Sequence, residues 1–284
     1  MLDAKDGNYY IKGFINSTAC LSAGKLGASE CRALEVYADD KKMTKEIEDH
    51  LFYNCGLYPI NNKTTSKFIL EYIKSMSKLN IVAEWFVNEN GKYRDKKILD
   101  LYSPNSQRVH SRSLEPYYHY QEAWSLLLEG KRVVTVTPFA DSIERQYQKK
   151  DLIWKKNPIL PDFELDIVKT KFSVGLTEKP EYASWFDELE KLKEEIIKKN
   201  PDFVIIGASG WSLPLVAFCS ENYIDSIHLG GGLQILFGVK GNRWLTHPII
   251  ATFFNEHWVY PSEEETPKHK DKLIGIDSSC YWRK

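Results

Sequence analysis

The most regular hydrophobic pattern of the chain lies in its second half. Apolar, β-branched runs at 132–137 and 203–206 predict buried strands, and a helical pattern follows each run. Further strands are predicted at 163–169, where polar and apolar residues alternate, and at 226–229. Strands that alternate with helices are typical of a parallel sheet covered on both faces. We therefore predict an α/β fold with a Rossmann-like, mostly parallel sheet and helices on both faces.

The first half of the chain is less regular. Residues 15–27 predict a strand that ends in a glycine loop, and Ala28 or Ser29 is expected to cap the helix that follows. The pattern further predicts mostly helix at 42–79, a strand at 81–87, a polar turn at 88–97, and an aromatic helix at 117–128 that Gly130 closes.

These patterns predict one domain over residues 1–284. We divide it into an N-terminal half with the Glu30 loop and a helical insertion (1–130), a regular βαβ half (131–244) and a docked C-terminal tail (245–284). Two aromatic residues at positions 281 and 282 suggest that the tail packs either over the core or against another chain, so a homo-oligomer remains an option.

Charge and composition exclude several partners. The 38 basic and 39 acidic residues give a net charge of −1, which provides no field for nucleic acid or anionic lipid. No run approaches the roughly 18 apolar residues of a membrane-spanning helix, and MLDAKDGNYY lacks the apolar core of a signal peptide. Five cysteines without a CxxC pair are typical of free thiols. We expect a cytoplasmic protein that does not span a membrane.

The strongest chemical signal is a pair of glycine loops that follow two predicted strands, at 207–210 and 230–232. Ligands of parallel sheets bind outside the carboxyl ends of the strands, where glycines let backbone N–H groups approach a phosphate. Glu30 and Asp141 fall in the first turns of helices that also follow predicted strands. The four segments are therefore expected at one edge of the sheet.

Several common sites do not match this sequence. The loop at 207–210 lacks the G-x-G-x-x-G spacing of a dinucleotide site, and no GxxxxGK[ST] motif occurs. The seven histidines show neither HxH nor HExxH spacing. A serine hydrolase remains an alternative, with Ser209 on a strand-to-helix turn and His247 or His257 as its base. A nucleoside diphosphate sugar fits the glycine loops and carboxylates better, because its transfer needs a diphosphate cradle and a nearby carboxylate or metal.

Several motifs resemble those of glycosyltransferases with the GT-D fold, a Rossmann-like family formerly listed as a domain of unknown function. The loop GKLGASE at 24–30 resembles the family pattern R-[IL]-G-x-x-E. Matches to a bacterial and viral polysaccharide-synthesis branch follow in the same order along nearly the whole chain. They are VTPFADSIERQY (136–147), LPDFEL (160–165), IGASGWSLPL (206–215), IHLGGGLQILFGVKGNRW (227–244), NEHWVYPSEEETPK (255–268) and CYW (280–282).

The resemblance implies a site for a nucleoside diphosphate sugar. The family's Asp-x-Glu motif holds a divalent metal, Mn²⁺ or Mg²⁺, but Ala28 stands in place of the Asp and only Glu30 is retained, so the use of a metal is left open. Lys25 takes the place of the family Arg and would neutralise a phosphate as a point charge. The donor-binding residues that the resemblance implies are Lys25, Gly27, Ser29, Gly207, Ser209, Gly230, Gly231, Gln234, Lys240 and Arg243.

The sequence thus predicts a nucleotide-sugar-dependent glycosyltransferase that acts on a hydroxyl of a glycan or lipid-linked acceptor. Glu30 is expected to hold the donor sugar or ribose or to act as a base, and Asp141 and His228 are the other candidates for the general base. Two other readings remain open, the Ser209 hydrolase and a nucleotide-binding subunit without catalytic activity.

Overall fold

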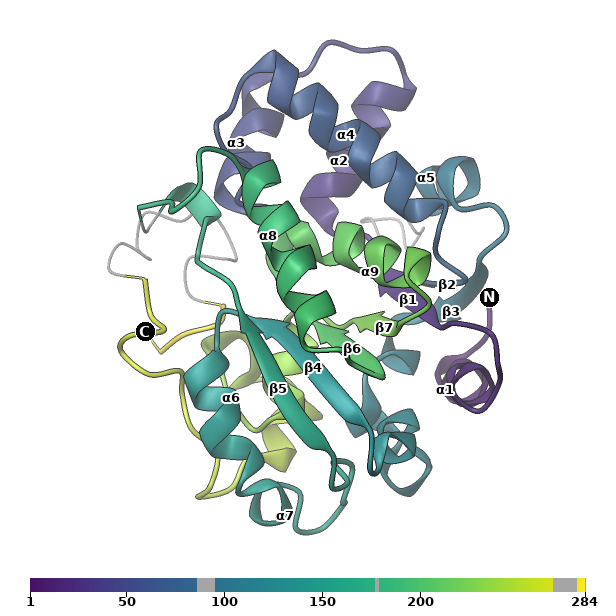
Figure 1. Cartoon of the computed structure of the whole chain (residues 1–284), viewed down its shortest axis with the longest axis vertical. Helices are drawn as coiled ribbons and strands as arrows, with labels where there is room; N and C mark the ends of the chain where they lie inside the picture. Colours follow the sequence, from purple (N-terminus) through teal and green to yellow (C-terminus); the bar gives the residue numbers. More distant parts are fainter. Residues whose placement is uncertain (86–94, 177–178, 268–279, 284) are drawn as a thin grey trace.

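A computed structural model describes residues 1–85, 95–176, 179–267 and 280–283. Within these residues, seven strands form one sheet in the order β3-β2-β1-β7-β6-β4-β5, and all neighbouring strands are parallel (Figure 1). The fold is an α/β, Rossmann-like fold, as predicted. The strands are β1 (Ser22–Lys25), β2 (Ile81–Glu84), β3 (Gln107–His110), β4 (Arg132–Thr137), β5 (Glu164–Lys169), β6 (Phe203–Ile206) and β7 (Asp225–His228).

The central strands β4 and β6 are buried on both faces of the sheet, which explains why their sequences are continuous, mostly apolar runs. Alternate residues of a strand point to opposite faces. Val133 of β4 and Phe203 of β6 join one core cluster, whereas Val134 and Val204 join the other. Each face therefore needs its own cover of helices.

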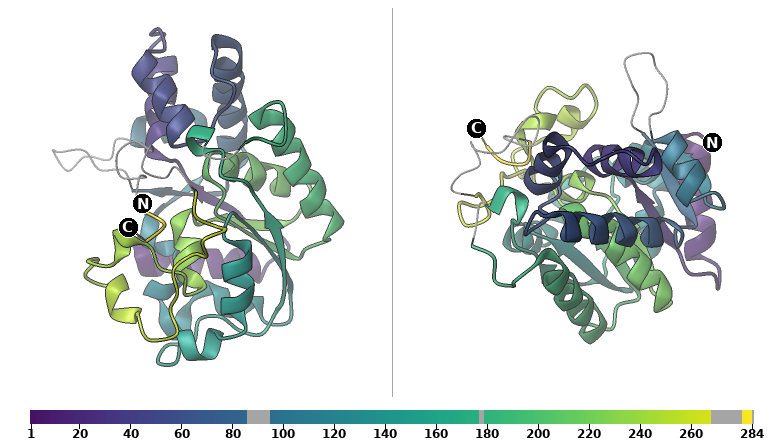
Figure 2. Two further views of the ribbon diagram at one scale, coloured as in Figure 1. Left: turned by 90° about the vertical axis from the view of Figure 1, so that its left-hand side faces the viewer. Right: turned by 90° about the horizontal axis from the view of Figure 1, so that it is seen from above.

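The two faces are covered by different parts of the chain (Figures 1 and 2). One core cluster takes residues from α2 (Ala28–Ala38), α3 (Lys45–Tyr53), α4 (Asn62–Met76), α5 (Lys96–Tyr102), α8 (Trp185–Lys198) and α9 (Ser212–Glu221). The other takes residues from α1 (Ala4–Ile15), α6 (Ala140–Tyr147), α7 (Lys150–Ile153), α10 (Gly231–Leu236) and short 3₁₀ helices between residues 111 and 128. None of the helices in the described residues is both long and apolar enough to cross a bilayer.

The strand predictions in the second half are confirmed, with both β4 and β6 at their predicted bounds. Three predictions in the first half are wrong. The segment 117–128 forms consecutive 3₁₀ turns instead of one helix. The strand predicted at 15–27 is shorter than expected, because α1 extends to Ile15 and β1 spans only Ser22–Lys25. Helix α2 begins after Gly27 without a side-chain cap, so neither Ala28 nor Ser29 caps it. The polar turn at 88–97 lies largely outside the described residues, and α5 begins at Lys96.

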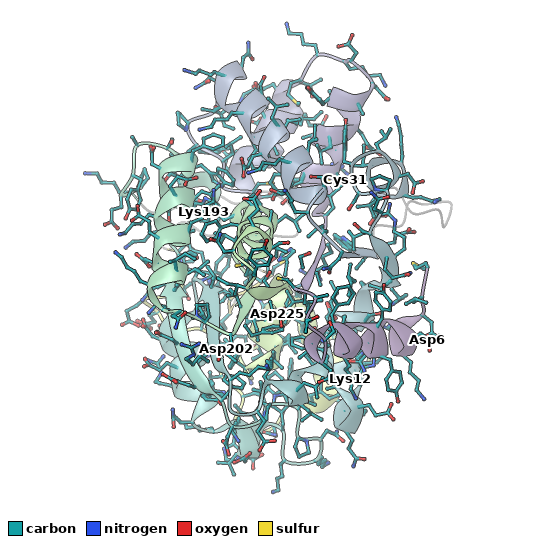
Figure 3. All side chains as sticks on the ribbon, turned by 45° about the vertical axis from the view of Figure 1, so that its right-hand side comes forward. Asp6, Lys12, Cys31, Lys193, Asp202 and Asp225 are labelled. Carbon is teal, nitrogen blue, oxygen red and sulfur yellow. The ribbon has the colours of Figure 1, made fainter. Side chains whose placement is uncertain are left out.

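Two aspartates connect neighbouring strands at the amino ends of the sheet. Asp202, just before β6, accepts hydrogen bonds from the backbone N–H and the guanidinium of Arg132 in β4. Asp225 at the start of β7 accepts one from the Leu21 N–H at 2.7 Å, next to β1 (both Asp residues are labelled in Figure 3). These two aspartates therefore have a structural role, at the edge of the sheet opposite to the glycine loops.

The C-terminal residues 280–283 pack onto the core of the same chain. Trp282 is 2% exposed, and its ring contacts Phe139 and Phe172. Its indole N–H donates to the Glu265 carbonyl at 2.9 Å. The aromatic end of the chain therefore covers the core, which was one of the two predicted alternatives.

We expect Trp282→Ala to lower the free energy of unfolding by about 3–5 kcal/mol, because it removes a fully buried aromatic ring and leaves a cavity. Urea denaturation followed by circular dichroism would measure the change. Leu70→Ala is the control, because Leu70 is 55% exposed and its truncation should cost about 0.5 kcal/mol or less. Equal losses in the two variants would contradict the docked position of Trp282.

Candidate functional site

A cleft of about 870 Å³ runs along the carboxyl edge of the sheet. Segments that follow every strand contribute to its wall, because parallel strands bring all their carboxyl ends to one edge. Representative lining residues, in the order of the strands they follow, are Lys25, Trp85, Arg112, Phe139, Lys171, Ser209 and Gly230. The edge predicted from the glycine loops is thus the edge that carries the cleft.

The two glycine loops touch each other in the floor of the cleft. A Cβ atom on Gly207 would lie 2.8 Å from the Gly230 carbonyl oxygen, so a side chain there would force the loops apart. Gly230 has a φ of +58°, in the left-handed region that glycine adopts without strain. Both glycines are therefore required by the backbone itself, whatever ligand the cleft binds.

Glu30 lies in the first turn of α2 and lines the cleft. Its carboxylate folds back over Gly27, where a Cβ would lie 2.1 Å from Oε2. The Tyr72 hydroxyl lies 3.3 Å from Glu30 Oε1 and donates to the Gly210 carbonyl at 2.7 Å. Burial and the neighbouring Glu30 raise the pKa of Tyr72 well above its usual range, so this hydroxyl stays protonated. Tyr72 thus holds the Glu30 turn and the 207–210 loop together.

Lys25, at the end of β1, forms an ion pair with Glu115 in the wall of the cleft. The Lys25 Nζ lies 3.2 Å from Glu115 Oε1, and the two side chains are only 18% and 15% exposed. The same ammonium lies 6.0 Å from the centre of the Trp85 ring. Lys25 therefore places a partly desolvated positive charge beside the glycine loops, with Glu115 as its counter-ion.

His228 ends β7 and lines the cleft next to Lys25. Burial and the nearby Lys25 charge lower the pKa of His228 from 6.5 to about 3. Its Nδ1 lies 3.3 Å from the Ile206 carbonyl oxygen and 3.2 Å from the Gly230 nitrogen. The imidazole is therefore neutral at neutral pH and binds a proton too weakly for efficient general-base catalysis, which disfavours the role predicted for it.

The described lining residues give the cleft an excess of positive charge. Five are Lys or Arg and two are Glu, while the whole chain carries a net charge of −1. The cations are Lys25, Arg32, Arg112, Lys171 and Arg243. Charges of one sign in a cleft concentrate ligands of the opposite sign, so this cleft favours anions.

Two of the predicted site residues do not line the cleft, which corrects their assignment. The Asp141 carboxylate, 45% exposed, pairs with Lys169 at 2.7 Å on the outer face of the edge strand β5. The Lys240 ammonium lies 5.1 Å from the centre of the Tyr260 ring instead. The side chain of Gln234 lines the cleft but also holds the chain end, because its amide donates to the Tyr281 carbonyl at 2.8 Å.

The other predicted residues lie in the cleft wall. Ser29 accepts a hydrogen bond from the Asn54 amide at 3.2 Å, and the Arg243 guanidinium lies 5.3 Å from the centre of the Trp244 ring. Gly231 packs against Tyr281, where a Cβ would lie 2.9 Å from the tyrosine ring. The cleft thus brings together Lys25, Gly27, Ser29, Glu30, Gly207, Ser209, His228, Gly230, Gly231, Gln234 and Arg243.

Ser209 does not have the geometry of an activated nucleophile. Its hydroxyl donates to the Asn54 carbonyl at 2.9 Å and not to a histidine. His247 lines the same cleft, but its Nδ1 faces the backbone N–H groups of Ile249 and Ile250. A serine hydrolase needs its base hydrogen-bonded to the nucleophile, so this arrangement disfavours that alternative.

The residues at the Glu30 turn do not fit a divalent metal. Ala28 supplies no ligand, and the Glu30 carboxylate is turned back over Gly27 and toward Tyr72. Within the described part of the chain, no group of three His, Cys, Asp or Glu side chains is placed to hold an ion. The cations of the cleft are therefore the protein groups that would face a diphosphate.

Sequence reasoning missed Arg112 and Glu115, which line the cleft after β3. Strand β3, Gln107–His110, is only four residues long and mostly polar, so no apolar run marked it. Without that strand, nothing placed the following segment at the carboxyl edge. The sequence offered one signal for this site, namely the charged residues Arg112 and Glu115 just before the apolar Pro116 and Tyr117, which are buried.

Comparisons with known proteins establish the fold alone. No protein-family model matches the chain, and no curated protein matches it either. One solved structure, described as the selenomethionine-substituted structure of a domain of unknown function, DUF1792, is similar to it. The TM-score is 0.50 at 16% sequence identity, over 93% of this chain and 91% of that one. The likeness supports the Rossmann-like arrangement of nearly the whole chain.

The low pKa of His228 should make the folded protein less stable in acid. Between pH 6.5 and about 3 the unfolded chain binds a proton at this residue and the folded chain does not, so stability falls as the pH falls through this range. We expect His228→Asn to lose less of its unfolding free energy than the wild type between pH 7 and pH 4. Urea titrations at several pH values would measure it, and parallel acid profiles would contradict the assignment.

Proposed function

We propose that the protein is a glycosyltransferase that moves a sugar from a nucleoside diphosphate donor to a hydroxyl of a glycan or lipid-linked acceptor, in the cytoplasm. The observation that carries the proposal is the positively charged cleft at the carboxyl edge, where the two glycine loops touch and Lys25 lies beside Gly230. Its volume of about 870 Å³ lies in the range of small-molecule and cofactor sites. Five of the seven segments that resemble GT-D glycosyltransferases contribute lining residues to this cleft, namely 24–30, 136–147, 206–215, 227–244 and 280–282.

The cleft offers separate groups for the parts of such a donor. Lys25 and Arg243 are placed to neutralise the diphosphate, and the loops at 207 and 230 let the backbone approach it. Aromatic side chains in the wall, among them Trp85 and Trp244, offer rings on which a base stacks. Glu30 lies at the opposite end of the β1 loop from Lys25 and lines the same cleft, where it would contact hydroxyl groups of the donor.

Charge stabilisation of the leaving group is the chemical task that these cations fit. Transfer breaks the bond between the sugar and the β-phosphate, and negative charge develops on the departing diphosphate. Fixed positive charges in a partly desolvated cleft stabilise that charge without reorganising. In this proposal Lys25 and the cleft arginines do this work, because the Glu30 turn does not fit a metal.

The first test is a thermal-shift panel of UDP, GDP, CMP, TDP and NAD, each with and without manganese. We expect one nucleoside diphosphate to raise the unfolding midpoint. At a concentration 100 times its Kd it would add about 2.7 kcal/mol to the unfolding free energy. NAD should give no shift, and manganese should leave the nucleotide shift unchanged. Lys25→Met should reduce the shift, because it removes a charge from the diphosphate site.

The absence of a shift with every nucleotide would count against the proposal. A shift that appears only with manganese would instead assign a metal to Glu30 and contradict the fit described above. Lys169→Met is the matched control for Lys25→Met, because Lys169 pairs with Asp141 outside the cleft. It should leave the shift unchanged.

Glu30→Gln separates an enzyme from a subunit that only binds nucleotide. We expect turnover to fall roughly 100-fold, because the change removes a charge that orients or stabilises the reacting donor. The affinity for the nucleoside diphosphate should stay within about twofold. Asp141→Asn is the control, since Asp141 lies outside the cleft. If neither turnover nor affinity changed in Glu30→Gln, Glu30 would have no role in the site.

A further inference from the structure

Transfer to a hydroxyl requires a group that accepts the hydroxyl proton, and the structure narrows the choice. Of the three bases predicted, Glu30, Asp141 and His228, Asp141 lies outside the cleft and His228 is a weak base. Among the described lining residues the carboxylates are Glu30 and Glu115. Glu30 is folded over its own helix turn, whereas Glu115 forms an ion pair with Lys25.

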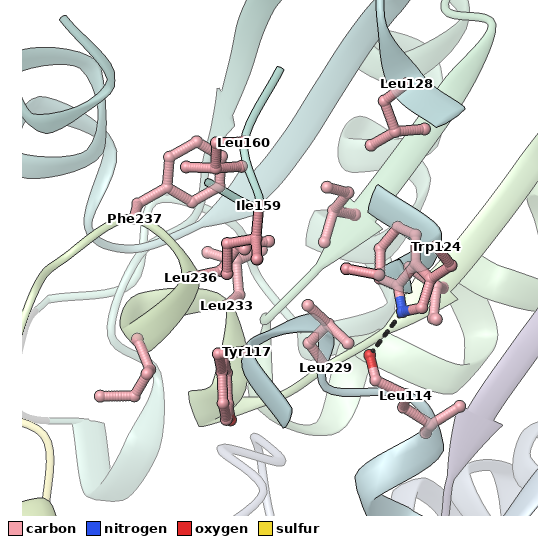
Figure 4. Packing of buried hydrophobic residues seen from close by; sticks show 14 of the residues in the cluster. Leu114, Tyr117, Trp124, Leu128, Ile159, Leu160, Leu229, Leu233, Leu236 and Phe237 are labelled. Atoms are coloured by element: carbon pink, nitrogen blue, oxygen red, sulfur yellow. Dashed lines mark hydrogen bonds between the residues drawn. The ribbon is translucent and has the colours of Figure 1, made fainter. Parts of the chain in front are cut away.

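The backbone around Glu115 is held rigidly by buried neighbours (Figure 4). Leu114 and Tyr117 are 0% and 1% exposed, and the indole N–H of Trp124 donates to the Leu114 carbonyl at 3.0 Å. Trp124 itself stacks on Phe203 of β6. The irregular segment after β3 is therefore fixed to the sheet, and it carries Glu115 to a constant position.

The Glu115 side chain lies beside the third glycine of the 230–232 loop. A Cβ on Gly232 would lie 3.5 Å from both Cγ and Oε1 of Glu115. The carboxylate, 15% exposed, thus stands between the glycine loop and Lys25. A catalytic base needs a fixed position in the site, and Glu115 contacts both Lys25 and the 230–232 loop, the groups proposed to bind the diphosphate.

We propose that Glu115 is the general base of the transfer reaction and that its ion pair with Lys25 couples this role to donor binding. The proposal rests on the proposed function. The diphosphate of the donor competes with Glu115 for Lys25. Once Lys25 binds the phosphate, the carboxylate loses this counter-ion and accepts a proton more readily, while the Tyr117 hydroxyl still holds it in place.

In the proposed reaction, proton transfer and sugar transfer take place in one step. A Glu115 oxygen accepts the proton of the acceptor hydroxyl while the hydroxyl oxygen forms a bond to C1 of the donor sugar. The bond from C1 to the β-phosphate oxygen breaks, and its electron pair leaves with the nucleoside diphosphate, whose charge Lys25 neutralises. Glu115 then returns its proton to water. The coupling further requires that the donor bind before the acceptor.

The experiment compares Glu115→Gln with the wild type in two measurements, turnover and affinity. Affinity is measured by titration with the nucleoside diphosphate that gives the largest thermal shift, and turnover with its sugar conjugates and the acceptor that the wild type uses. We expect kcat to fall about 100-fold or more, because glutamine does not accept the proton. We expect the nucleotide to bind about threefold more tightly, because its competitor for Lys25 is gone.

A structural role for Glu115 predicts a different result, in which affinity and kcat fall together. That result would overturn the proposal, as would a kcat within about threefold of the wild type. Glu122→Gln is the matched control, because Glu122 lies in the same segment, is exposed and does not line the cleft. Glu115→Asp keeps a carboxylate and should recover part of kcat, which guards against a folding defect in the Gln variant.

The two proposals fail in distinguishable ways. If the wild type neither bound a nucleotide nor transferred a sugar, both the proposed function and the assignment of Glu115 as general base would be wrong. If the wild type did both and Glu115→Gln behaved as the wild type, only the assignment of Glu115 would fail. In the double variant Lys25→Met, Glu115→Gln, the gain in affinity from Glu115→Gln should disappear, because no Lys25 charge remains to compete for.

Discussion

The parallel direction of the sheet is the constraint on which the rest of this structure depends. Because every strand runs the same way, segments as distant in sequence as Lys25 and Gly230 reach one edge. The closest approach is between the two glycine loops, where a Cβ on Gly207 would lie 2.8 Å from the Gly230 carbonyl oxygen. That contact fixes β6 and β7 at the floor of the cleft, and the charged side chains are arranged around it.

The sequence was sufficient to predict the elements whose own residues determine them. Strands β4 and β6 are buried on both faces, so their apolar runs predicted them correctly. Strand β3 is polar and short, and it forms because β2 offers it a paired edge. The 117–128 segment is rich in aromatic residues, but tertiary packing of Trp124 and Tyr117 holds it in 3₁₀ turns. Such elements depend on partners that local patterns do not contain.

The same distinction applies to the site. The predicted residues close to the glycine loops line the cleft, because a position directly after a strand of a parallel sheet brings the chain to the carboxyl edge. Asp141 also follows a strand, but an ion pair with Lys169 on the edge strand holds it outside the cleft. Glu115 follows a strand that was not predicted, so its approach to Lys25 across 90 residues of sequence was invisible. Only the folded structure decides which side of a helix end a carboxylate faces.

The Lys25–Glu115 pair also resolves an apparent conflict in the cleft. A cleft that binds an anion gains from positive charge, yet a partly buried lysine without a counter-charge is costly to desolvate. Glu115 supplies that counter-charge while the cleft is empty, at the cost of competing with the ligand. The competition is useful if the displaced carboxylate has its own chemical task, because donor binding then both satisfies Lys25 and releases the base. A carboxylate beside the anion site is therefore what the proposed transfer reaction would require.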